Sequence, residues 1–163
     1  MRATVVDTGP IVAFLSRRDR YHDWAVGAFA SVSPPLLTCE AVLSEAVFLL
    51  GGSGRVLELV ERGVVQVPFR LDAEVGAIRT LLQKYQNVRM DLADACIVRM
   101  TEIHDDSVVM TLDSEFRDVF RRRGRHRIPT IMPPDRDRRA DTETFRETAA
   151  APRFGLKGGS RDI

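Results

Sequence analysis

The chain has few cysteines, little net charge and no long apolar run, and each shortage excludes a class of protein. Only Cys39 and Cys96 occur among its 163 residues. Neither a disulfide scaffold nor the Cys and His spacing of a zinc site is therefore present. Both cysteines lie in apolar helical patterns, which predicts buried free thiols in a reducing compartment. No apolar run approaches the ~18 residues of a membrane span, and the segment before Asp7 is too short and polar for a signal peptide. We expect a soluble, cytoplasmic protein without a membrane partner.

Short strand-like runs alternate with helical patterns along most of the chain, which predicts a parallel sheet covered on both faces. Strands are expected near residues 3, 36, 64, 108 and 128, and helices over Ile11–Leu15, Tyr21–Ala30, Cys39–Leu50, 53–61, Asp72–Gln86, Asp91–Ile103 and Ser114–Arg121. The predicted fold is an α/β protein, a three-layer α/β/α sandwich with a five-stranded parallel sheet. We expect one domain over residues 1–134 and a charged, flexible tail over residues 135–163.

Two acidic residues follow predicted strands directly. Asp7 comes after Ala3–Val6, and Asp113 lies just past the run that ends at Thr111. Ligands bind beyond the carboxyl ends of the strands in open parallel sheets, so both positions suit a functional site. Taken singly, each aspartate has an alternative role as the cap of the helix that follows it.

Glu45 and Asp94 lie inside apolar helical patterns, where an unpaired carboxylate would cost several kcal/mol if it were buried. The helix around Glu45 is apolar almost all round, which predicts a buried side chain; the alternative is a buried ion pair. Asp91 precedes Asp94 by three residues at a helix start, so a capping role explains Asp91 well. Asp94 lies one turn further on between two alanines, which leaves room for a ligand to approach.

The four acids together predict a site for a divalent cation, because Mg²⁺ and Mn²⁺ take oxygen ligands. The catalytic candidates are Asp7, Glu45, Asp94 and Asp113, with Asp7 and Asp94 as metal ligands and Thr8, Asp91 and Thr111 in supporting positions. Such a site can activate water and neutralise charge developing on a phosphate, and no histidine base is needed.

Four segments resemble the PIN-domain nucleases, particularly the bacterial ribonuclease toxins of the VapC type. The similar segments are Val5–Ala13, Ser44–Leu50, Met90–Val98 and Val109–Phe116. The resemblance implies a five-stranded parallel sheet and cleavage of RNA with Mg²⁺ or Mn²⁺. It also implies a homodimer and a cognate antitoxin protein as partners. Asp118 competes with Asp113 as the fourth acid. RNA processing without an antitoxin, or a non-catalytic nucleic-acid-binding module, remains the alternative function.

Two other classes that use an aspartate after the first strand fail on residue identity. A haloacid-dehalogenase-like phosphotransferase needs a second aspartate where this chain has Gly9. A phosphoacceptor receiver domain needs a lysine after a late strand, but the two lysines here are Lys84 and Lys157, away from the stretch after Thr111.

An arginine run just past the last acidic motif is the candidate surface for RNA. The formal net charge of +1 gives no general attraction to a polyanion. Local cations must therefore supply it, and Arg121, Arg122 and Arg123 are the nearest cluster. Gly124 suggests a loop that follows a nucleic-acid backbone. The alternative is a solvated loop with no role, in which case Arg17, Arg18 and Arg20 are the next candidates for the RNA-binding surface.

Overall fold

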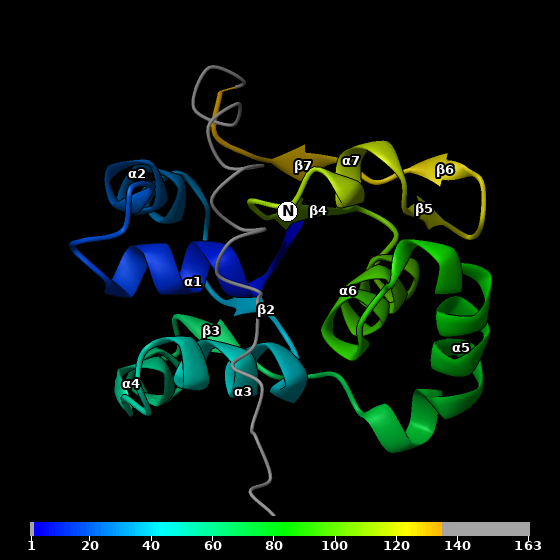
Figure 1. Cartoon of the computed structure of the whole chain (residues 1–163). Helices are drawn as coiled ribbons and strands as arrows, with labels where there is room; N and C mark the ends of the chain where they lie inside the picture. The colour runs from blue at the N-terminus through cyan, green and yellow to red at the C-terminus, as the bar shows by residue number, and fades with distance from the viewer. Residues whose placement is uncertain (1, 135–163) are drawn as a thin grey trace, which may run out of the picture. The chain divides into compact units, whose positions relative to one another are not determined.

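A computed structural model describes residues 2–134 (Figure 1). The elements are β1 (Ala3–Val6), α1 (Thr8–Leu15), α2 (His22–Ser31), β2 (Leu36–Leu37), α3 (Glu40–Leu49), α4 (Arg55–Glu61), β3 (Val65–Gln66), α5 (Leu71–Lys84), the short 3₁₀ helix η1 (Gln86–Val88), α6 (Leu92–Ile103), β4 (Ser107–Met110), α7 (Glu115–Asp118), β5 (Arg121–Arg122), β6 (His126–Arg127) and β7 (Thr130–Ile131). The expected tail over residues 135–163 lies outside the described residues.

Five strands form one parallel sheet in the order β3-β2-β1-β4-β7, as predicted. The central pair is in continuous register from Ala3 opposite Ser107 to Val6 opposite Met110. Both strands are apolar on both faces because helices cover both faces of a parallel sheet. Val5, Val6, Val109 and Met110 accordingly have no exposed surface.

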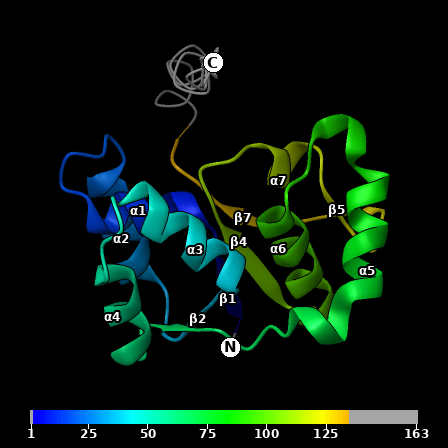
Figure 2. The same cartoon turned by 60° about the horizontal axis from the view of Figure 1, so that its bottom comes forward.

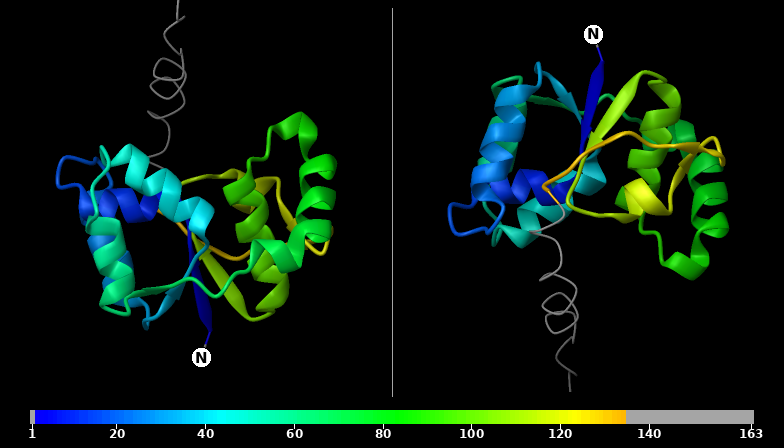
Figure 3. Two further views of the ribbon diagram at one scale, coloured as in Figure 1. Left: turned by 90° about the horizontal axis from the view of Figure 1, so that it is seen from below. Right: turned by 90° about the horizontal axis from the view of Figure 1, so that it is seen from above.

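Helices gather in two groups beside the sheet. Figure 3 shows α1, α2 and α4 on one side and α5 with α6 on the other. Helix α3 contacts both α1 and α6, and Figure 2 shows it between these two groups. Cys39, which precedes α3, and Cys96, on α6, are buried free thiols, as predicted. None of the helices within residues 2–134 has the length and apolar character that a bilayer crossing requires.

Three local predictions are wrong in detail. Thr38 precedes the predicted helix and is a favourable N-cap residue type, but the N-cap of α3 is Cys39, and the Thr38 hydroxyl instead donates to the Val6 carbonyl at 2.8 Å. Helix α5 begins at Leu71, so Asp72 lies in its first turn, where its charge favours the helix dipole. The arginine run is a loop only at Arg123–Arg125, because β5 and β6 pair on either side of this turn as a short antiparallel hairpin.

The contrast between two isoleucines of α6 tests this packing. Ile97 is fully buried, whereas Ile103 is 47% exposed at the end of the same helix. We expect Ile97→Ala to lower the free energy of unfolding by about 2–5 kcal/mol, because it leaves a cavity under the helix. Ile103→Ala should cost less than about 1 kcal/mol. Urea unfolding of both variants measures the difference, and equal losses would contradict this placement of α6.

Candidate active site at the carboxyl end of the sheet

Asp7 occupies the centre of the site, at the end of β1 and the start of α1. Its side chain is buried. The Thr8 backbone N–H donates to Asp7 Oδ1 at 2.8 Å, and the Thr111 hydroxyl donates to Asp7 Oδ2 at 2.7 Å. Burial raises the pKa of Asp7 from 3.8 to about 6. The two hydrogen bonds oppose this shift, while the charges of Asp113 and Glu45 add to it.

Glu45 reaches the same place from α3, but it is exposed, so the prediction of a buried side chain is wrong. The helix has apolar residues on several sides, yet it buries only Val42 and Ala46. Phe48 is 80% exposed. The Thr8 hydroxyl donates to Glu45 Oε2 at 2.7 Å. Glu45 therefore has water around it and a fixed hydrogen bond to the residue after Asp7.

Asp91 and Asp94 form a reciprocal capping box at the start of α6. The Asp94 N–H donates to Asp91 Oδ1 at 2.8 Å, and the Asp91 N–H donates to Asp94 Oδ2 at 3.1 Å. The predicted capping role of Asp91 is therefore present. Burial and then the Asp91 charge raise the pKa of Asp94 to about 8, and the charges of Asp7 and Asp113 add to this rise. Asp94 thus shares an electrostatic environment with the acids that follow β1 and β4.

Asp113 lies in the loop after β4 and connects back to Asp7 through Thr111. The Asp113 N–H donates to the Thr111 hydroxyl at 2.9 Å, and Asp113 Oδ1 accepts from the Glu115 N–H at 2.8 Å. Burial raises the pKa of Asp113, with the Asp91 charge adding to it. The N-cap of α7 is Ser114, one residue later than predicted. The hydrogen bond to Glu115 instead shapes the loop before that helix.

Gly9 lets this loop approach the start of α1 closely. A Cβ atom at Gly9 would come within 3.0–3.2 Å of the Leu112 side chain, which is tighter than ordinary packing allows. The absence of a side chain there helps to hold Asp113 close to Asp7.

Sequence reasoning overlooked Glu115 and kept Asp118 open as a competitor. Burial and the charges of Asp113 and Asp91 raise the pKa of Glu115, so it belongs to the acidic group. Asp118 instead forms an ion pair with Arg117 at 2.7 Å, and about half of its side chain is exposed. The sequence signal for Glu115 was its spacing two residues after Asp113.

The donor set suits a hard divalent cation, since carboxylate and hydroxyl oxygens are the ligands that Mg²⁺ and Mn²⁺ prefer. The pKa values of Asp7 and Asp94 are raised first by burial and then by neighbouring carboxylates, so negative charge is costly here without a cation. Within the described residues, however, no group of three or more His, Cys, Asp or Glu side chains is arranged to hold an ion. The acids share one end of the sheet without forming a closed coordination shell.

The predicted RNA-binding arginines make contacts within the protein. Arg121 donates to the Phe120 carbonyl at 2.8 Å. Arg122 donates to the carbonyls of Asp105 and Ser107. Ser107 is the first residue of β4, whereas the acids follow the last residues of β1 and β4. The contacts of Arg122 therefore lie at the opposite end of the sheet from the carboxylates.

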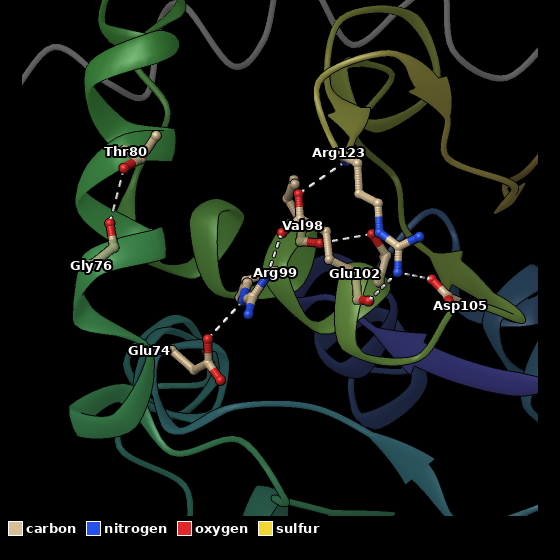
Figure 4. Close-up of polar contacts among 9 residues, drawn as sticks. Glu74, Gly76, Thr80, Val98, Arg99, Glu102, Asp105 and Arg123 are labelled. Atoms are coloured by element: carbon tan, nitrogen blue, oxygen red, sulfur yellow. Dashed lines mark hydrogen bonds and ion pairs between the residues drawn. The ribbon is translucent and has the colours of Figure 1, made fainter.

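Arg123 belongs to an ionic network that joins the hairpin to α6 and α5 (Figure 4). Its guanidinium pairs with Asp105 at 2.6 Å, and its N–H donates to Glu102 Oε1 at 3.0 Å. Glu102 also pairs with Arg99 at 2.8 Å, and Arg99 pairs with Glu74 of α5 at 2.7 Å. This arginine contributes to local structure, which weighs against a role in holding RNA.

A model of the PIN domain family matches residues 4–121, which include all four acids and most of the sheet. The chain belongs to the PIN domain family. The family predicted from the four motifs is thus confirmed, and so is the α/β fold. Members of this family are generally nucleases and typically use divalent metal ions, so membership implies a nuclease-type function. No curated protein matches this PIN domain.

The pKa of Asp94 predicts how metal-free stability depends on pH. An acid whose pKa is raised by folding costs stability as it ionises, so stability falls as pH rises from about 3.8 towards about 8. Asp7 ionises at lower pH than Asp94, with its midpoint at about 6. Between pH 6 and 8, Asp94→Asn should therefore gain about 1–2 kcal/mol over the wild type.

Thermal unfolding in EDTA at several pH values measures this gain. Asp72→Asn is the matched control, because it removes an exposed acid that pairs with Arg70 on α5. Its pH dependence should follow the wild type. If melting temperature depends on pH in the same way in the wild type and in Asp94→Asn, ionisation of Asp94 does not lower stability, and the prediction is wrong.

Proposed function

We propose that this PIN domain is a Mg²⁺- or Mn²⁺-dependent endoribonuclease and the toxin of a toxin–antitoxin pair. The observation that carries the nuclease proposal is one run of hydrogen bonds at the carboxyl end of the sheet. It connects Glu45 through Thr8 to Asp7, and Asp7 through Thr111 to the Asp113 loop. These hydrogen bonds hold Glu45, Asp7 and the Asp113 loop, which are far apart in the sequence, next to one another.

The proposed roles follow from these contacts and, for Asp94, from the charges of Asp7 and Asp113 that add to the rise in its pKa. Asp7 and Asp94 would hold the ion, which when bound supplies an activated water and offsets charge on the scissile phosphate. The Thr111 hydroxyl fixes the orientation of the Asp7 carboxylate. The Thr8 hydroxyl holds Glu45, whose exposed position suits contact with substrate or with its water. Asp113 adds negative charge from the other central strand, which increases the attraction for a cation.

The toxin role rests on the resemblance of the four motifs to VapC-type toxins. It brings with it a cytoplasmic location, a homodimer and an antitoxin that inhibits the enzyme. An inhibitor that presents an arginine to these carboxylates would satisfy them without a metal. RNA processing without an antitoxin is the competing role for the same site.

The nuclease proposal predicts metal-dependent cleavage of RNA that requires particular acids. Asp7→Asn and Asp94→Asn should each lower kcat by roughly 10²–10³, because each removes a ligand charge worth several kcal/mol. Asp91→Asn should have a smaller effect, since asparagine caps a helix as well as aspartate does. Cleavage of a labelled RNA with Mg²⁺, Mn²⁺ or EDTA measures these changes.

Asp118→Asn is the matched control, because Asp118 pairs with Arg117 outside the group of acids. It should keep activity within about twofold of the wild type. Full activity in excess EDTA would exclude the metal mechanism. If Asp118→Asn is inactive while Asp113→Asn is active, Asp118 is the fourth acid of the site and Asp113 is not.

The toxin proposal predicts that expression of the wild-type chain alone slows bacterial growth. Asp7→Asn should relieve the effect, because it removes the catalytic charge. Co-expression of a small protein encoded directly before this gene should also restore growth. A wild-type chain that cleaves RNA in vitro but leaves growth unchanged would favour RNA processing instead.

A further inference from the structure

A basic hollow lies at the far end of α1 from Asp7. It has a volume of about 350 Å³ and is lined by Leu15, Ser16, Arg17, Arg18, Leu50, Ser53 and Arg55. Three guanidinium groups and two hydroxyls face this space, and no carboxylate is among the lining residues. The hollow is therefore a place of concentrated positive charge in a chain whose net charge is only +1.

The arginines of the hollow differ from those of the β5–β6 hairpin in their contacts. Arg17 and Arg18 are exposed, and neither makes a hydrogen bond or ion pair among residues 2–134. Arg55 donates one N–H to the Leu15 carbonyl at 2.8 Å, which places its guanidinium at the end of α1. Arg122 instead donates to the carbonyls of Asp105 and Ser107, and Arg123 forms an ion pair with Asp105. Arg17 and Arg18 therefore keep their charges available for an external anion, beside a hollow that no carboxylate lines.

The hollow is also connected to the acidic site through two helices. Helix α1 has eight residues, with Thr8 at the site and Ser16 just beyond its other end, so it spans about 12 Å. Helix α3 carries Glu45 and is followed by Leu50, which lines the hollow. A single strand with its scissile phosphate at the carboxylates would reach the hollow within a few nucleotides.

We propose that this hollow binds backbone phosphates of the RNA substrate, a few nucleotides from the cleaved bond. Guanidinium groups suit this ligand because they bind phosphate oxygens with paired hydrogen bonds. The assignment rests on the proposed nuclease function and adds the surface that holds RNA to it. It replaces the hairpin arginines as the cationic surface.

A protein segment is the competing occupant. Phe48 and Leu49 on α3 and Leu57 on α4 are exposed, and they flank the lining residues within Leu50–Arg55 in the sequence. Exposed apolar side chains of this kind suit a protein partner. RNA is favoured for the hollow itself, because five of its seven lining residues are arginine or serine.

The test compares Arg17→Gln/Arg18→Gln with Arg79→Gln/Arg125→Gln, which removes the same charge from exposed positions on α5 and the hairpin. Binding of a single-stranded RNA is measured in EDTA over a range of salt concentrations. Loss of two phosphate contacts should weaken binding about tenfold or more and reduce the slope of log affinity against log salt by about 1.4. The control should keep the wild-type slope.

Cleavage separates this inference from the nuclease proposal. With metal, the Arg17→Gln/Arg18→Gln variant should have a raised KM on the long RNA and wild-type cleavage of a dinucleotide, which carries only the scissile phosphate. If the variant keeps the wild-type salt slope while the wild-type protein cleaves RNA, the assignment of the hollow is overturned and the nuclease proposal stands. RNA binding that depends on Arg17 and Arg18 without cleavage would support the hollow and overturn the nuclease. Unchanged RNA binding with loss of a co-expressed protein partner would assign the hollow to protein.

Discussion

The Asp7 carboxylate is buried at the end of β1, and the Thr111 hydroxyl from the neighbouring strand end holds it at 2.7 Å. The two residues are 104 positions apart, so this contact exists only when β1 and β4 pair in the correct register. The hydrogen bond offsets part of the cost of burying the charge, yet the pKa of Asp7 still rises to about 6. The fold therefore keeps a strained carboxylate at its centre, and the other acids are arranged around it.

This strain has a functional meaning because it opposes folding without a ligand. Burial raises the pKa values of Asp7 and Asp94 most, and neighbouring carboxylates add to both shifts, so a bound divalent cation would relieve part of this cost. The acids approach without forming a closed shell among the described residues. The same side chains thus lower metal-free stability and carry the oxygen ligands that suit a divalent cation.

Positive charge is distributed according to two different roles. Arginines of the β5–β6 hairpin stabilise the join between the hairpin, α6 and the loop before β4, and Figure 4 shows Arg123 within that network. Arg17 and Arg18 have no partner of this kind among the described residues. Clusters of arginine in a sequence therefore do not identify a binding surface until their intramolecular contacts are known.

Apolar periodicity and short motifs are local properties, so they were enough to predict the parallel sheet and the family, although not the β5–β6 hairpin. The capping role of Asp91 was also predictable, since it depends on the neighbouring residues alone. Asp7 and Asp94 as metal ligands stay a prediction. Tertiary structure decided that Glu45 is exposed, because α3 presents only part of its apolar surface to the core. It decided that Glu115 joins the acids while Asp118 pairs with Arg117, and that the hairpin arginines lie towards the other end of the sheet. Each of these outcomes depends on which distant residues become neighbours, and sequence patterns over a few residues carry no record of that.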